Sequence, residues 1–341
     1  MNPPKYFVGF DIAADDFAAT IGTYPWRITA SPQTFANTLA GFEQMLSWLV
    51  QHEATVEQSV CCLEATGVYG EAVAHYLVAR NYRVAIEPPL KVKRAFHPTG
   101  HKNDPVDSQQ IAAYACRFFD ELSFWQPPSE RIEQIRVLLT TREQLTKETT
   151  MHKNALTALK RKVASTPLAE RIHTETIQQL QGRQKEIDTE IKRLIDQDDT
   201  WRGWKKIILS SPGVGLMLAA HTLVLTDGFT QLFSSKQFSA YLGICPYEYQ
   251  SGKSVYRPAR SRGYGPPAVR RLLHLAARSL AHHHPDFRSY FERKRAEGKP
   301  KRLIYNNIEN KIVKIMCAVL KSKTPYDRNY RPALASVSTT T

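Results

Sequence analysis

The first 125 residues alternate between short apolar runs and amphipathic segments. Helical spacing of apolar residues predicts helices over 42–49 and 71–80, and a further helix that begins at Asp104. Strands are predicted at 6–11, 59–64 and 83–86, and β-type residues also fill 17–28 around a Tyr24-Pro25 turn. Strands separated by helices indicate an α/β domain with a mixed sheet, which we place at 1–128.

The pattern changes to helical stripes after residue 131. The stripe positions follow 4-3-4-3-4 and then 3-4-3-4-3 spacing: Leu145, Thr149, His152, Leu156, Leu159 and Val163, then Ile177, Leu180, Gln184, Ile187, Ile191 and Leu194. This spacing predicts a coiled-coil helical middle over 129–200. Pro167 separates the stripes, so two long helices either fold back as a hairpin or pair with another chain. A helical bundle within one monomer fits the spacing equally well.

The remainder is predicted to be a mostly α-helical domain over 201–330, followed by a flexible tail at 331–341 whose residues are small and polar. No apolar run reaches the roughly 18 residues that a membrane span requires, and the N-terminal residues lack a signal-peptide pattern. We therefore expect a cytoplasmic protein. The 5 cysteines include no C-x-x-C pair, so neither a disulfide framework nor a zinc site is indicated.

Charge separates the two halves of the chain. Residues 1–130 carry 9 basic and 14 acidic side chains, a net charge of −5, whereas residues 131–341 carry 37 basic and 18 acidic, a net charge of +19. Such a basic region is costly through self-repulsion unless a polyanion covers it, and nucleic acid is the commonest such partner. An anionic membrane surface is disfavoured, because the sequence has no basic amphipathic anchor or lipidation motif.

Candidate chemistry in the N-terminal domain lies in four carboxylates. Asp11 and Glu64 each end a predicted strand, where ligands normally gather, although either one alone is typical of a turn. Asp104 and Asp107 open a predicted helix on either side of Pro105. They fit an N-cap and a capping box that need no further function, and the same positions also suit a metal ion.

The order of these four acidic residues along the chain resembles that in the DEDD insertion-sequence transposases and the related Piv-type DNA invertases. The resemblance rests on the segments 8–13, 63–69, 89–93 and 102–107. It implies an RNase H-like (RuvC-like) N-terminal domain, similar to Holliday-junction resolvases, in which Asp11, Glu64, Asp104 and Asp107 form an acidic tetrad. Asn103 and Ser108 stand where the family more often has Thr and Ala, and neither departure removes a carboxylate.

Four carboxylates at one site suit the cleavage of phosphodiesters by metal ions. Phosphodiester cleavage accumulates negative charge on oxygens, and two divalent ions about 4 Å apart activate the attacking group and stabilise the leaving one. Carboxylate oxygens are the ligands that Mg²⁺ prefers, and Mn²⁺ accepts the same set. The resemblance therefore implies a Mg²⁺ (or Mn²⁺) cofactor.

The C-terminal domain contains a second family-like stretch, Phe238–Pro246 followed by Tyr249–Val255. By resemblance, Ser251 takes the position of the family's nucleophilic serine, and Ser254 is the alternative if the register is wrong. Basic side chains available to nucleic acid are Lys253, Arg257, Arg260, Arg262, Arg270 and Arg271. A P-loop is disfavoured, because Tyr247 stands where that motif requires Gly. The segment 259–265 departs from the family's usual Ile-Ser-Lys-type element.

These observations predict a DNA transposase or site-specific recombinase in which Ser251 attacks DNA with the help of ions held by the tetrad. The resemblance further implies double-stranded donor and target DNA, an element-encoded guide noncoding RNA, homodimers or homotetramers with shared active sites, and a place at the nucleoid. One alternative is a structure-specific, Holliday-junction-type endonuclease that uses metal and water alone. Another is a nonenzymatic nucleic-acid-binding protein on an RNase H-like scaffold.

Overall fold

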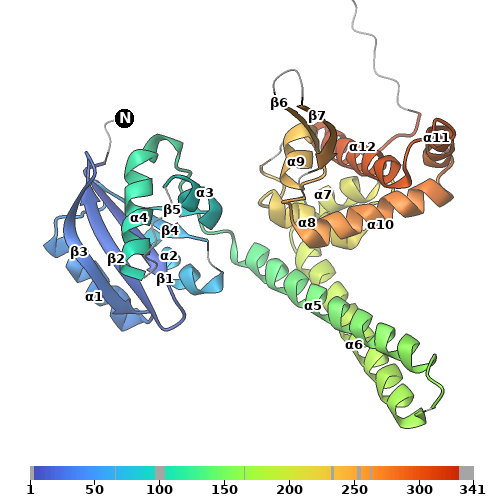
Figure 1. Cartoon of the computed structure of the whole chain (residues 1–341), viewed down its shortest axis with the longest axis horizontal. Coiled ribbons are helices and arrows are strands. Elements are labelled where there is room, and N and C mark those ends of the chain that lie inside the picture. The colour runs from blue at the N-terminus through green and yellow to red at the C-terminus, as the bar shows by residue number, and fades with distance from the viewer. Residues whose placement is uncertain are drawn as a thin grey trace, which may run out of the picture. The chain divides into compact units, whose positions relative to one another are not determined.

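The computed structural model describes two compact units, Met1–Pro127 and Pro128–Thr341 (Figure 1). It describes residues 4–65, 67–96, 104–164, 166–231, 234–251, 255–261 and 263–329. Within these ranges, the side chains of 104, 105, 249–251 and 255–259 lie outside the description. The predicted tail at 331–341 lies outside the described residues as well.

A mixed sheet forms the centre of the first unit, as predicted. Its five described strands are ordered β3-β2-β1-β4-β5. The strands are β1 (Tyr6–Ile12), β2 (Asp16–Thr23), β3 (Arg27–Ala36), β4 (Ser59–Glu64) and β5 (Arg83–Glu87). The first three pair antiparallel, whereas β4 lies parallel to both β1 and β5. The carboxyl ends of β1, β4 and β5 therefore meet at one edge of the sheet.

Helices cover both faces of this sheet. They are α1 (Leu39–Gln51), α2 (Glu71–Val78), α3 (Pro89–Arg94) and α4 (Asp104–Arg117), with 3-10 turns η1 (Val68–Gly70) and η2 (Phe119–Glu121). Successive side chains of β1 point to opposite faces of the sheet, so they belong to two separate buried cores. Val8 and Phe10 share a buried cluster with α1 and α2, while Phe7 packs with Ile111 and Tyr114 of α4.

The second unit begins with two long helices that fold back on one another, α5 (Glu130–Leu159) and α6 (Pro167–Asp196) (Figure 1). Polar stripe residues bond across this α5–α6 hairpin: Gln184 Nε2 donates to Thr149 Oγ1 at 3.1 Å, and the Nδ1 atoms of His152 and His173 lie 2.8 Å apart. The predicted extension of the first stripe to Val163 is wrong, because α5 ends at Leu159 and Val163 is fully exposed.

The rest of the second unit is mostly helical, as predicted. Its elements are α7 (Asp199–Leu209), α8 (Leu216–Leu225), α9 (Ser235–Tyr241), β6 (Pro246–Ser251), β7 (Val255–Ser261), α10 (Pro267–His283), α11 (Pro285–Ala296) and α12 (Lys301–Ser322). Ile135 of α5 and Ile191 of α6 belong to the same buried core as Ile308 and Ile312 of α12. The base of the α5–α6 hairpin is therefore anchored in the helical body. None of the described helices is long and apolar enough to cross a membrane.

Candidate functional site

Asp11 and Glu64 occupy neighbouring positions at the carboxyl edge of the sheet. The register pairs Phe10 of β1 with Leu63 of β4, so Asp11 and Glu64 follow as the next pair. Register partners in parallel strands share a face, and this face is the one that α4 covers, because Phe7 of β1 packs against α4. Both side chains are partly buried.

Gly9 brings the start of α4 against this edge. A Cβ at Gly9 would lie 2.3 Å from both the carbonyl oxygen of Ser108 and the amide nitrogen of Ala112. The hydroxyls of Ser108 and Thr20, both buried, lie 2.8 Å apart and fix the same turn of α4 to β2. Cys116, at the other end of α4, donates to the carbonyl of Thr23. The helix therefore runs antiparallel to β1 and begins beside the carboxyl edge.

The electrostatics of Glu64 place Asp107 in its neighbourhood. Burial raises the pKa of the Glu64 carboxyl, the nearby ammonium of Lys93 lowers it, and the nearby carboxylate of Asp107 raises it again. The two negative charges repel one another unless a cation lies between them. Of the predicted tetrad, the described side chains of Asp11, Glu64 and Asp107 thus belong to one edge of one unit.

The fourth member, Asp104, begins α4 one turn before Asp107, and its side chain lies outside the described residues. Among the side chains that are described, no three His, Cys, Asp or Glu groups lie close enough to hold a metal ion. The donor set nevertheless fits a hard divalent cation, since the four predicted ligands offer only carboxylate oxygens.

Sequence reasoning missed a fifth carboxylate at this edge. Glu87 ends β5 in register with Glu64, and its side chain is almost completely buried. Lys91 of α3 pairs with it, with Nζ and Oε2 3.1 Å apart. The strand prediction ended at Ile86, one residue too early, because Pro88-Pro89 follows directly. Only the parallel register of β4 and β5 identifies Glu87, because the sequence 83–87 has no polar–apolar alternation that points to it.

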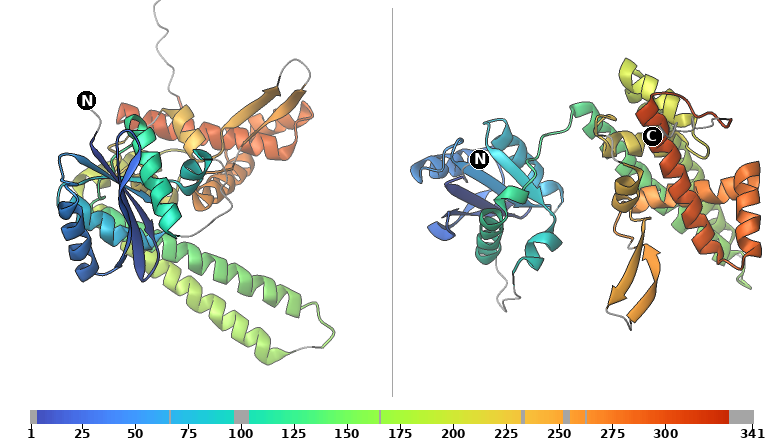
Figure 2. Two further views of the ribbon diagram at one scale, coloured as in Figure 1. Left: turned by 60° about the vertical axis from the view of Figure 1, so that its left-hand side comes forward. Right: turned by 90° about the horizontal axis from the view of Figure 1, so that it is seen from above.

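Ser251 belongs to the second unit and ends strand β6. It pairs with Val255 across the antiparallel β6–β7 hairpin, which projects from the helical body in Figure 2. The hairpin was not predicted, and its base is held tightly. Asn306 and Asn310 of α12 both donate to the carbonyl of Ile244 at 3.1 Å.

A close backbone approach completes the base of this hairpin. A Cβ at Gly265 would lie 2.1 Å from the carbonyl carbon of Leu242, so only glycine fits there. Together with the two asparagines, this approach fixes where β6 and β7 leave the helices. The predicted site positions Lys253 and Arg262, and the alternative nucleophile Ser254, lie outside the described residues.

The remaining predicted arginines differ in their surroundings. Arg257 pairs with Tyr249 on the hairpin, and its side chain lies outside the description, whereas Arg260 is exposed opposite Tyr247. Arg270 of α10 lies against the backbone at Gly263, where a Cβ would be 3.0 Å from its guanidinium. Arg271 forms an ion pair with Glu143 of α5, which ties α10 to the α5–α6 hairpin.

Two family models match the chain in consecutive parts. Residues 8–163 match the DEDD transposase model of the IS110 type, and residues 205–292 match the model described as transposase IS116/IS110/IS902 family. The first match contains all four predicted acidic positions, and the second contains Ser251.

Individual relatives agree with these matches. The chain is 26% identical over 329 residues to the pilin gene-inverting protein of Moraxella lacunata. The aligned residues cover 95% of this chain and 98% of that protein. It is 26% identical over 207 residues to the transposase for insertion sequence element IS1111A of Coxiella burnetii, covering 54% and 56% of the two chains. The chain belongs to the IS110-type DEDD transposases and Piv-type recombinases, enzymes that cleave and rejoin DNA strands.

Proposed function

We propose that this transposase breaks DNA by attack of Ser251 on a phosphodiester, at a site completed by the acidic edge of the first unit. One observation carries the proposal: adjacent strand ends and the start of α4 bring Asp11, Glu64 and Asp107 to a single edge. Ser251 ends a strand on a hairpin whose base is fixed, which suits a group that must be presented to a substrate.

Asp11, Glu64, Asp104 and Asp107 are the residues that would hold Mg²⁺ or Mn²⁺. Such ions supply positive charge for the phosphate oxygens and lower the pKa of a bound hydroxyl. The four carboxylates orient that charge. A serine hydroxyl is a weak nucleophile near neutral pH, and neither Gln250 nor Gly252, its neighbours in sequence, is a base. The serine therefore requires the acidic edge of the same chain or of another chain.

The breakage and rejoining of DNA strands by this route needs no nucleotide cofactor. The Oγ atom of Ser251 forms a bond to phosphorus while a bridging P–O bond of the DNA breaks, and the serine proton passes to the leaving oxygen through the solvent. A strand-end hydroxyl then attacks the phosphoserine, which restores Ser251 and joins a new pair of strands. Because one phosphoester replaces another, the bond energy is conserved.

Covalent trapping tests the serine. A DNA substrate with a nick beside the scissile bond prevents rejoining, so a protein–DNA adduct should accumulate in the unaltered chain. Ser251→Ala should abolish the adduct and recombination while leaving DNA binding unchanged, and Ser254→Ala is the matched control. An adduct that survives Ser251→Ala and disappears in Ser254→Ala would move the chemistry to Ser254. Metal-dependent nicking that persists in both variants would favour the endonuclease.

A paired experiment tests the acidic edge. Asp11→Asn and Glu64→Gln keep the shape of each side chain but remove a charged oxygen ligand, so each should lower cleavage by at least about 100-fold. DNA binding and the thermal unfolding midpoint should stay unchanged. Exposed Asp199 on α7 offers a control, because Asp199→Asn removes an acid outside this edge. Unaltered cleavage by both edge variants would exclude these carboxylates as metal ligands.

We include in the proposal an element-encoded guide RNA and an assembly of two or four chains. The net charge of +19 over 131–341 supports a second polyanion beside DNA. Purifying the chain from cells that carry the whole element, and sequencing the bound nucleic acid after separate RNase and DNase treatments, tests the RNA directly. Recovery of random cellular fragments alone would contradict a dedicated guide.

A further inference from the structure

A row of lysines runs along the exposed side of α12, outside the span of both family models. Lys311, Lys314 and Lys321 are all exposed, and with Ala318 they follow a 3-4-3 spacing that keeps them on one side of the helix. Within the described part of the chain, no carboxylate lies within ion-pair distance of these three lysines. The row therefore presents unneutralised positive charge.

The first lysine of the row lies in a crowded cationic environment. Its Nζ atom is 3.7 Å from the centre of the Tyr290 ring. Burial lowers the pKa of Lys311, and so do the nearby charges of Arg293 and Lys294 on α11 and of Lys314. An anion bound at this place would relieve the repulsion between these cations.

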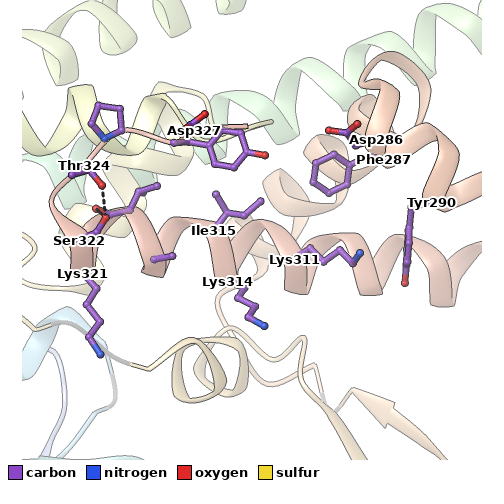
Figure 3. A pocket seen from close by; sticks show the side chains of 14 residues that line it. Asp286, Phe287, Tyr290, Lys311, Lys314, Ile315, Lys321, Ser322, Thr324 and Asp327 are labelled. Atoms are coloured by element: carbon purple, nitrogen blue, oxygen red, sulfur yellow. Dashed lines mark hydrogen bonds between the residues drawn. The ribbon is translucent and has the colours of Figure 1, made fainter. Parts of the chain in front are cut away.

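A pocket of about 1180 Å³ opens beside the row, between α11, α12 and the segment 324–327. Figure 3 shows Ile315 extending from one side of α12 and Lys314 and Lys321 from the other, all three of them lining the pocket. Most of the surface that lines it is apolar, and Phe287 is buried in its wall.

The two carboxylates in the lining offset the three lysines only in part, because an arginine neutralises one of them. Arg328 donates two hydrogen bonds to Asp286, at 3.0 and 2.8 Å, and so neutralises it. Asp327 accepts a hydrogen bond from the backbone N–H of Asn329 at 2.8 Å. The pocket therefore combines an apolar interior with positive charge along α12.

We propose that this pocket and lysine row bind a single, unpaired DNA strand. The phosphates lie along the lysine row, and an unstacked base enters the pocket against Ile315 and Tyr290, which are both partly exposed. Lys314 and Lys321 are separated by about 10 Å along the helix axis, a distance that an extended strand bridges easily. Aromatic and apolar surface beside a positive groove is the usual arrangement for single-stranded nucleic acid.

Duplex DNA would contact the lysine row but not the apolar pocket. A duplex offers phosphates to the lysines, but its bases are stacked inside and leave the apolar pocket empty. A strand that is opened or cut during recombination offers both parts at once. The inference depends on the DNA chemistry of the family and not on Ser251, so it is tested in the full chain carrying Ser251→Ala.

The lysine row is tested by fluorescence anisotropy with a labelled oligothymidylate. The triple variant Lys311→Gln, Lys314→Gln, Lys321→Gln should bind at least about 10-fold more weakly. The slope of log affinity against log salt should fall by about 2, because each phosphate contact to a single strand contributes about 0.7. Arg183→Gln, Lys185→Gln, Lys192→Gln removes the same charge from exposed positions of α6 and is the control. Equal losses in both triple variants would overturn the assignment.

The pocket is tested by Ile315→Ser, with exposed Leu303→Ser on the same helix as its control. Ile315→Ser should weaken oligothymidylate binding about 5-fold and leave the affinity for a duplex of the same length unchanged. Thermal unfolding confirms that both variants fold. Equal weakening of duplex and single strand would rule out base insertion. A larger loss for oligouridylate than for oligothymidylate would assign the pocket to RNA and overturn the DNA proposal.

Discussion

Gly9 shows how one residue type controls the position of the acidic edge. A methyl group at this position would overlap the backbone of α4 at Ser108 and Ala112, and backbone cannot rotate away. We expect Gly9→Ala to displace the start of α4, to lower the free energy of unfolding by about 3 kcal/mol and to abolish DNA cleavage. Urea unfolding of the full chain and a cleavage assay measure the two effects.

Gly182 provides the matched control for that substitution. It lies within α6, and nothing stands within 4 Å of the place where its Cβ would be. Gly182→Ala should therefore stabilise the chain by up to about 1 kcal/mol through helix propensity and leave cleavage unchanged. A similar response at both glycines would mean that the tight contact with α4 is unimportant.

His221 on α8 gives stability a dependence on pH. Burial is the main reason that the pKa of His221 falls to about 4 from its ordinary value of 6.5. The positive charges of Arg142 and Arg271 also lower this pKa, and the negative charge of Glu143 raises it. Above the ordinary value both folded and unfolded chains hold the ring neutral. As pH falls from there to about 4, only the unfolded chain takes up the proton, so stability decreases by about 3 kcal/mol.

The variant His221→Gln isolates this contribution. It keeps a neutral polar side chain but cannot be protonated, so the difference in unfolding free energy between variant and unaltered chain should change by about 3 kcal/mol across that pH range. Urea unfolding at several pH values measures it. Parallel pH profiles for the two proteins would show that His221 is not buried in the neutral form.

At the scale of elements, the sequence located most of the sheet because its inner strands are short, apolar and bounded by turn residues. β3 was largely missed beyond Ile28, since it is an edge strand with most of its side chains exposed. The β6–β7 hairpin was missed because its residues are polar and basic, with little apolar alternation. Asp11 and Glu64 were predicted at strand ends and Asp104 and Asp107 at a helix start, and the family resemblance joined them into a tetrad. Glu87 required the register of β5.

The α5–α6 hairpin owes part of its register to a buried polar pair. Thr149 is buried, and its hydroxyl accepts a hydrogen bond from the side-chain amide of Gln184 on the opposite helix. A double-mutant cycle with Thr149→Val and Gln184→Leu should give a coupling energy of about 1 kcal/mol in urea unfolding. The exposed pair Gln144–Glu148, on one face of α5, should give only about 0.3 kcal/mol. Equal coupling energies in the two cycles would show that the Thr149–Gln184 pair does not help to set the register.

At the scale of the whole molecule, charge and chemistry are divided between the units. The first unit carries the acidic edge, and residues 1–130 have a net charge of −5. The second unit carries Ser251, and residues 131–341 have a net charge of +19. Each unit has its own buried core. We therefore expect residues 128–341 alone to bind DNA with nearly the salt dependence of the full chain, as measured by anisotropy. Tight binding by residues 1–127 would contradict this division.

The same division predicts how inactive chains behave when mixed. If the acidic edge of one chain serves Ser251 of another, a dimer of Glu64→Gln and Ser251→Ala chains contains one site with both defects and one site with neither. Mixing the two inactive proteins should then restore about a quarter of the unaltered cleavage, because random pairing makes half of all dimers mixed and each mixed dimer has one intact site. If both parts come from one chain, every site contains a defect and the mixture stays inactive. Gel analysis of a labelled substrate distinguishes the two outcomes, and co-expression ensures that the chains exchange.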